Sequence, residues 1–113
     1  MQADNTEISI LIPAHNESEN IEKLVNEIYT NLKSTDFNNT FEVIVINDGS
    51  TDNTENICKK ILKDYSNLKI INMKLNSGKA YALDMGIQNS KGKIIGTIDA
   101  DLQYSSKNLI DMI

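Results

Sequence analysis

The sequence predicts an α/β protein in which a parallel sheet is covered by helices on both faces. Short segments of almost uninterrupted isoleucine, valine and leucine alternate with segments whose apolar residues recur every three or four positions. The first pattern is typical of strands buried in a parallel sheet, and the second is typical of amphipathic helices. Polar residues follow each expected strand directly, which indicates a ligand site at one edge of the sheet.

The first half of the chain contains two expected strands and two expected helices. The strands are predicted at residues 8–12 and 41–46, and Ser18 is the expected N-cap of the first helix. A turn through residues 48–50 leads into the second helix. The residues expected to face the core are Ile21, Leu24, Val25, Ile28 and Leu32 in the first helix, and Ile57, Ile61, Leu62 and Tyr65 in the second.

The second half continues the same alternation. A third strand is predicted at residues 68–73, a helix at 79–88, a fourth strand at 93–98, and helical periodicity resumes at Ser106. Because crossovers between parallel strands are almost always right-handed, we expect the strand order 3-2-1-4.

Composition narrows the classes of protein that fit. The 113 residues, of which 40% are hydrophobic and 24% charged, are typical of one globular domain. The net charge of −5 argues against a nucleic-acid partner, which needs clustered lysine and arginine. The single cysteine, Cys58, has no internal partner for a disulfide and is expected to be a small, half-buried side chain. With no signal peptide or membrane span in the sequence, we expect a cytoplasmic protein.

Two carboxylates stand two residues apart where the fourth strand ends. Asp99 and Asp101 point the same way if the chain there is extended, and two like charges held close together require a counter-ion. A divalent metal such as Mg²⁺ fits, because it is often held by one or two carboxylates and the phosphates of a substrate. Taken alone, the pair is explained equally well by an Asp-rich turn.

The other strand ends carry polar residues as well, and in a parallel sheet all of them share one edge. Each has a structural explanation by itself: Gly49 as a turn residue, and Asp52 or Thr54 as an N-cap. Their coincidence at one edge favours a ligand site. The common nucleotide motifs do not fit, since no Gly-x-Gly-x-x-Gly follows the first strand. His15 has no second histidine or cysteine nearby for zinc, so we interpret it as a loop residue that contacts ligand.

Four blocks of the sequence, in this order, resemble the signature of the family-2 inverting glycosyltransferases. The Leu-Gln pair after the acidic residues is most similar to the dolichol-phosphate mannose synthase and polyprenyl-phosphate glycosyltransferase branch. Departures from the pattern occur at Asn47, at Ala80 and at Ser105–Ser106. The blocks are residues 13–17, 45–52, 76–86 and 99–103.

The resemblance implies a glycosyltransferase-A fold whose Rossmann-like half binds a nucleoside diphosphate sugar of uridine or guanosine. It implies that Asp48 accepts hydrogen bonds from the base, that Lys79 holds the diphosphate, and that Asp99 bridges ribose and metal. The implied metal is Mg²⁺ or Mn²⁺, held by Asp99, Asp101 and Gln103. The residues implied for the nucleotide sugar are Pro13, Ala14, His15, Glu17, Asp48, Gly49, Ser50, Lys79 and Asp99.

The resemblance also implies an acceptor, with a polyprenyl phosphate at the membrane surface as the candidate. No general base for it is identified in the sequence, so we expect residues 1–113 to be the donor-binding part of a longer, membrane-associated enzyme. Self-association through an apolar C-terminal face is a further expectation. Two alternatives stay open: a non-catalytic nucleotide-sugar-binding module and, less well supported, a sugar nucleotidyltransferase, whose arginine-rich phosphate loop is missing. The apolar residues concerned are Leu109, Ile110, Met112 and Ile113.

Overall fold

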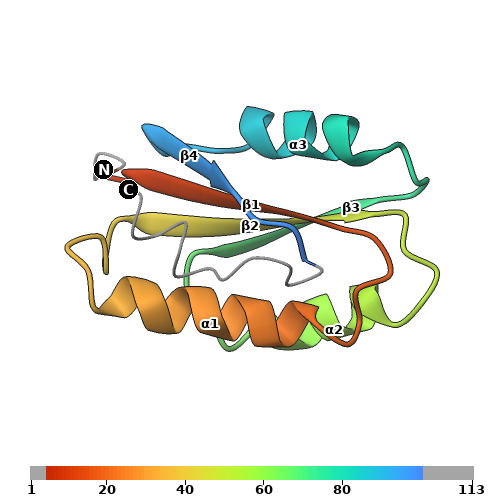
Figure 1. Ribbon diagram of the computed structural model, residues 1–113, viewed down its shortest axis with the longest axis horizontal. Helices are drawn as coiled ribbons and strands as arrows, with labels where there is room; N and C mark the ends of the chain where they lie inside the picture. Colours follow the sequence, from red (N-terminus) through yellow and green to blue (C-terminus); the bar gives the residue numbers. More distant parts are fainter. Residues whose placement is uncertain (1–4, 101–113) are drawn as a thin grey trace.

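A computed structural model describes residues 5–100 as a four-stranded sheet between two layers of helices (Figure 1). Helices α1 and α2 cover one face of the sheet and α3 covers the other, which confirms the predicted α/β architecture. In chain order the elements are β1 (Ile8–Ala14), α1 (Ile21–Lys33), β2 (Phe41–Asp48), α2 (Thr54–Ile61), β3 (Leu68–Met73), α3 (Lys79–Gln88) and β4 (Ile94–Thr97).

The strand order is β3-β2-β1-β4 and every pair is parallel, as predicted. The register places Leu11 of β1 opposite Ile44 of β2 on one side and Thr97 of β4 on the other. The chain therefore leaves β1 toward β2 and β3, and returns later to add β4 on its opposite side. Ligands bind outside the carboxyl ends of the strands at such a switch point. The loops after β1, β2 and β3 lie together at the right of Figure 1.

The apolar core has a larger part under α1 and α2 and a smaller part under α3. Alternate residues of β1 divide between them: Ile10 belongs to the larger part, and Leu11 to the smaller. Gly86 lets α3 approach the sheet, because a Cβ atom there would lie 2.8 Å from Cδ1 of Ile46. This close packing fixes α3, and so the position of its first residue, Lys79, at the carboxyl edge of the sheet.

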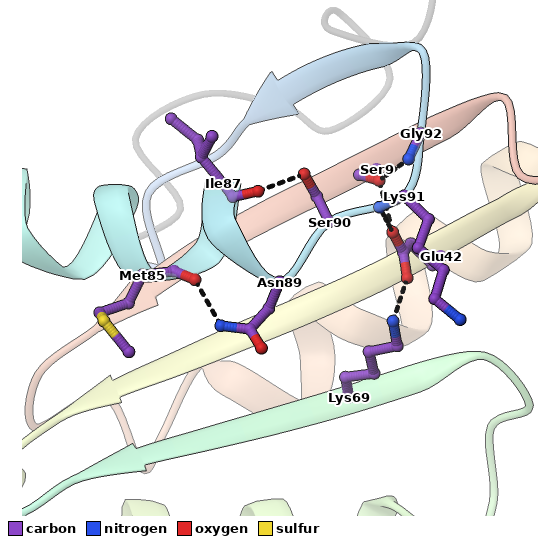
Figure 2. A network of polar contacts seen from close by, with 9 residues as sticks. All are labelled: Ser9, Glu42, Lys69, Met85, Ile87, Asn89, Ser90, Lys91 and Gly92. Atoms are coloured by element: carbon purple, nitrogen blue, oxygen red, sulfur yellow. Dashed lines mark hydrogen bonds and ion pairs between the residues drawn. The ribbon is translucent and has the colours of Figure 1, made fainter.

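A buried polar network closes the opposite edge of the sheet (Figure 2). The Glu42 carboxylate accepts hydrogen bonds from the Ser9 hydroxyl (2.6 Å) and the Lys91 N–H (2.6 Å), and pairs with Nζ of Lys69 at 2.7 Å. Burial alone would raise the pKa of Glu42, but the contacts with Lys69, Ser9 and the Lys91 N–H outweigh it and lower that pKa. The Ser9 oxygen also accepts the Gly92 N–H, so the network ties the α3–β4 loop to the sheet.

Some local predictions in the first helix pair were wrong. Helix α1 begins at Ile21 with Asn20 as its N-cap residue, and Ser18 instead donates its N–H to Oδ2 of Asp52. Helix α2 ends at Ile61, so Leu62 is 43% exposed instead of facing the core. Tyr65 lies beyond that helix, although its ring packs on the core aromatic Tyr29 with centroids 4.6 Å apart.

Cys58 is fully buried, not half-buried, and burial raises the pKa of its thiol to about 11. The predicted helix from Ser106 and the apolar C-terminal residues lie outside the described part of the chain, and self-association through them stays a prediction. None of the helices within residues 5–100 is both long and apolar enough to cross a membrane.

Candidate functional site

A cavity of about 250 Å³ opens at the carboxyl edge of the sheet, where the sequence predicts a ligand site. It brings together residues from all four strand ends. The sequence analysis did not single out Asn76 or Ala100, although both lie within the polar blocks that it identified. Gly49 and Ser50 stand behind the lining, and Asp101 and Gln103 lie outside the described residues. The lining residues are Pro13, Ala14, His15, Glu17, Asp48, Asn76, Lys79, Asp99 and Ala100.

Asp48 organises the loop between β3 and α3. Its Oδ1 accepts the Ser77 N–H at 2.8 Å and its Oδ2 accepts the Gly78 N–H at 3.0 Å, while the residue is only 4% exposed. Each carboxylate oxygen keeps a second lone pair for another donor. Asp48 therefore holds the loop that precedes Lys79 and still has acceptor capacity facing the cavity.

Gly49 is required because the β3–α3 loop passes directly over it. Its φ is +62°, and a Cβ atom there would lie 2.3 Å from the backbone nitrogen of Asn76. Next to it, the Ser50 hydroxyl accepts the Asn16 N–H at 2.9 Å and donates to Oδ1 of Asn47 at 2.5 Å. These two residues support the walls of the cavity and do not line it.

Asn16 joins the loops after β1 and β2. Its φ of +55° is in the left-handed region, which asparagine tolerates better than most residues, and its Oδ1 accepts the N–H groups of Thr51 (2.8 Å) and Asp52 (3.2 Å). Asp52 in turn accepts the N–H and hydroxyl of Thr54. Burial alone would raise the pKa of Asp52, but the hydrogen bonds from Thr54 and Ser18 together outweigh it and lower that pKa to about 2. The N-cap residue of α2 is Asn53, and Asp52, one position earlier, accepts the N–H of the first helical residue, Thr54.

His15 is held in one orientation against Asp48. Its Nδ1 lies 2.8 Å from the Asp48 carbonyl oxygen, which can only accept, so Nδ1 carries the proton of this contact. Its Nε2 faces the side-chain amides of Asn16 and Asn76, each at 3.4 Å. The ring thus links the first, second and third strand ends at one wall of the cavity.

Lys79 and Asp99 meet across the cavity. Lys79 is the first residue of α3, and its Nζ lies 2.5 Å from Oδ1 of Asp99, which follows β4. The side chains are 58% and 34% exposed, so the pair is open to solvent. Asp99 therefore presents a carboxylate oxygen that already binds a cation in this structure.

The donor set at this point fits a hard divalent metal. Within residues 5–100, no three histidine, cysteine or acidic side chains converge to hold a metal by themselves. Asp99 supplies an accessible oxygen ligand, and Mg²⁺ commonly uses one or two carboxylates with phosphate oxygens in the remaining positions. The cavity is thus suited to a metal that arrives with a phosphorylated ligand.

Along residues 9–113 the sequence matches the family model described as glycosyl transferase family 2. The chain belongs to this family. This confirms the resemblance on the four sequence blocks, and the cavity lies where those blocks meet.

Two curated family members illustrate the match. A dolichyl-phosphate beta-glucosyltransferase of Trichomonas vaginalis is 33% identical over 97 residues, which are 83% of this chain and 30% of that protein. A dodecaprenyl-phosphate galacturonate synthase of Rhizobium johnstonii is 32% identical over 108 residues, which are 95% of this chain and 31% of that protein. The chain therefore spans less than a third of the length of these relatives.

Solved structures agree with the fold. The mannosyltransferase PcManGT from Pyrobaculum calidifontis, in complex with GDP-Man and Mn²⁺, superposes with a TM-score of 0.77 at 25% identity, covering 90% of this chain and 29% of that one. S. aureus TarS 1-349 in complex with UDP-GlcNAc gives a TM-score of 0.76 at 26% identity, covering 95% of this chain and 30% of that one. Both neighbours carry a nucleotide sugar in their structures.

Proposed function

We propose that this chain binds the donor in an inverting glycosyltransferase that transfers a sugar from a nucleoside diphosphate sugar to a polyprenyl phosphate. The observation that carries the proposal is the cavity at the switch point, where Asp48, Lys79 and Asp99 face one space. A buried acceptor, a cation at a helix start and an exposed carboxylate are the groups that a base, a diphosphate and a metal require.

The base is proposed to lie beside Asp48, Pro13 and Ala14. The carboxylate of Asp48 can accept the imide N–H of uracil, or the ring N–H and amine of guanine, with the lone pairs that its loop contacts leave free. The neighbours with GDP-Man and UDP-GlcNAc support both bases equally, so the proposal covers uridine and guanosine donors.

The diphosphate is proposed to lie at the start of α3. Lys79 supplies a flexible cation there, and the positive end of the helix dipole favours an anion. A bound Mg²⁺ or Mn²⁺ neutralises charge on the departing nucleoside diphosphate. Asp99, and from the sequence resemblance Asp101 and Gln103, are the residues proposed to hold it.

The acceptor site and the general base are proposed to lie in the sequence that the relatives have beyond the matched third of their length. The names of these two relatives include dolichyl and dodecaprenyl phosphate, which supports a polyprenyl phosphate acceptor and action at a membrane surface. The alternative, a non-catalytic donor-binding module, makes a different prediction for sugar transfer.

Calorimetric titration tests donor binding. UDP- and GDP-sugars should bind with Mn²⁺ present and much more weakly after chelation, because an acidic chain otherwise repels an anionic ligand. Asp101→Ala should remove the metal dependence, whereas Asp36→Asn, which removes a charge before β2 at the far edge, should not. Equal binding with and without metal, or no binding, contradicts the proposal. Transfer to a polyprenyl phosphate by the longest available form of the protein separates enzyme from module.

A further inference from the structure

We infer that the Lys79 ammonium is a placeholder cation, which pairs with Asp99 when no ligand is bound and moves to the diphosphate when metal and nucleotide bind together. The inference deepens the proposed function, on which its nucleotide step rests. It predicts that the protein binds a free divalent metal poorly and binds metal and nucleotide cooperatively.

The geometry of the ion pair carries the first step. Nζ of Lys79 lies 2.5 Å from Oδ1 of Asp99, at the distance of a direct contact with no room for another ion between the two atoms. A divalent metal and an ammonium both bind carboxylate oxygen, so they compete for this atom. A metal on either oxygen of Asp99 would lie close to the ammonium, so repulsion between the two cations weakens metal binding until the ammonium has left.

The ammonium is able to leave without disturbing the fold. The backbone before Lys79 is fixed, because the Gly78 N–H donates to Asp48, and α3 itself is packed on the sheet through Gly86. The Lys79 side chain is 58% exposed, so rotation about its side-chain bonds moves the charge while the backbone stays in place.

Charge explains why metal and nucleotide should arrive together. Metal alone displaces Lys79 from Asp99 and leaves two cations side by side, while the ammonium gains no new partner. A nucleoside diphosphate brings the anionic oxygens that the displaced Lys79 needs. By linkage, nucleotide then raises the affinity for metal by the same factor by which metal raises the affinity for nucleotide.

Titration of the nucleotide-free protein with Mn²⁺, read from the electron paramagnetic resonance signal of free Mn²⁺, tests the placeholder role. Loss of an exposed ion pair that competes with the metal should raise the Mn²⁺ affinity by a factor of up to about five. Loss of the repulsion between the ammonium and the metal should raise that affinity further. Lys79→Gln should therefore tighten Mn²⁺ binding by about fivefold to tenfold, whereas Lys79→Arg, which keeps the cation, should stay near wild type.

Lys74→Gln is the matched control, because it removes the same charge from an exposed position in the loop that precedes Lys79. It should tighten Mn²⁺ binding by less than about twofold, through screened long-range charge alone. In an Asp99→Asn background, Lys79→Gln should have no further effect, since the competition acts through that carboxylate. Equal effects of Lys79→Gln and Lys74→Gln, or no detectable Mn²⁺ binding by Lys79→Gln, overturn the inference. Far-UV circular dichroism establishes that each variant is folded.

Lys79→Gln should weaken nucleotide binding, although it tightens Mn²⁺ binding. With Mn²⁺ saturating, UDP or GDP should bind Lys79→Gln about tenfold more weakly than wild type, because the diphosphate has lost its cation. If Lys79→Gln tightens Mn²⁺ binding but neither nucleotide binds wild type, the proposed function fails and the competition at Asp99 stands. If both nucleotides bind wild type and Lys79→Gln equally well, the transfer of Lys79 to the diphosphate is wrong.

Discussion

Truncation of Glu42 should destabilise the protein more than any change at an exposed carboxylate, although Glu42 lies far from the cavity. The residue is 3% exposed, and its Oε2 accepts both the Ser9 hydroxyl and the Lys91 N–H, while Oε1 meets Lys69 (Figure 2). Glu42→Ala leaves the two donors on Oε2 without their acceptor. A buried group that loses its partner costs about 1–3 kcal/mol, so we expect a loss of about 2–4 kcal/mol.

Glu42→Gln separates hydrogen bonding from charge. Its amide oxygen can replace Oε2 and keep both donors, whereas its NH₂ group meets the Lys69 ammonium and repels it. Since the Lys69 side chain is 39% exposed, its charge moves into water and is not trapped. The loss is then the difference between charged and neutral hydrogen bonds, about 1–2 kcal/mol.

Urea unfolding followed by circular dichroism measures both values, with the slope of free energy against urea expected to stay unchanged. Glu55→Ala is the control, because its ion pair with Lys59 is exposed on both sides and should contribute less than about 0.5 kcal/mol. A Glu42→Ala variant as stable as the Glu55→Ala control would refute the reasoning.

The pH dependence gives a second measurement of the same network. The folded-state pKa of Glu42 lies below its unfolded value, so its ionised form stabilises the protein above the unfolded pKa, and this stability is lost as the pH falls through the folded pKa. The stability difference between wild type and Glu42→Gln should therefore be constant near neutral pH and shrink below a pH of about 4. A difference that grows on acidification contradicts the assigned direction.

Three further changes test the site and the core. Asp48→Asn leaves one of the two loop N–H groups without an acceptor, so the free energy of unfolding in urea should fall by about 1–2 kcal/mol. Calorimetry should also show weaker nucleotide binding, and unchanged values in both measurements would contradict the loop contacts. Gly49→Ala should lower the free energy of unfolding in urea by at least about 2 kcal/mol, because its Cβ would collide with the backbone of Asn76. A loss below about 1 kcal/mol would contradict the close approach. Cys58 should resist a thiol reagent in the native protein and react at the rate of unfolding, since burial raises its pKa to about 11; rapid native labelling would contradict its burial.

The fold was predictable because its signals are local and redundant. Each strand is a short run of branched apolar residues, and the handedness of crossovers restricts the strand order without any knowledge of contacts. The Ser18 cap was wrong because α1 begins later, at Ile21, and Ser18 lies in the preceding loop, where its N–H donates to Asp52, 34 positions away in sequence. Local capping rules do not consider such distant partners. The prediction that Tyr65 belongs to the second helix was also wrong. Its position fits helical periodicity, but its contact with the Tyr29 ring explains an apolar residue there equally well.

The site was predictable in its composition and less so in its internal contacts. Parallel strands bring their carboxyl ends to one edge, so the sequence alone assigned Asp48, Lys79 and Asp99 to one region. The contacts of Asp48 with the β3–α3 loop, and of Asn16 with the β2–α2 loop, join residues about 30 or more positions apart. Such pairings depend on the exact course of two loops, which hydrophobic periodicity does not specify.

The two edges of the sheet use lysine–carboxylate pairs in opposite ways. Lys69 pairs with a Glu42 side chain that is 4% exposed, whereas Lys79 pairs with an Asp99 side chain that is 34% exposed. Loss of Lys69 leaves the buried Glu42 carboxylate without a counter-ion in a place that solvent reaches poorly. Loss of Lys79 leaves the Asp99 carboxylate, which water can hydrate.

Lys69→Gln should therefore lower the free energy of unfolding by about 1–3 kcal/mol, while Lys79→Gln should change it by less than about 0.5 kcal/mol. Urea unfolding of both variants at neutral pH measures the difference. A pair that contributes little to stability can exchange its partner for a ligand at little cost, which is what a cation at a binding site requires. If the two variants are equally destabilised, Lys79 is a structural residue and its ion pair is not available for exchange.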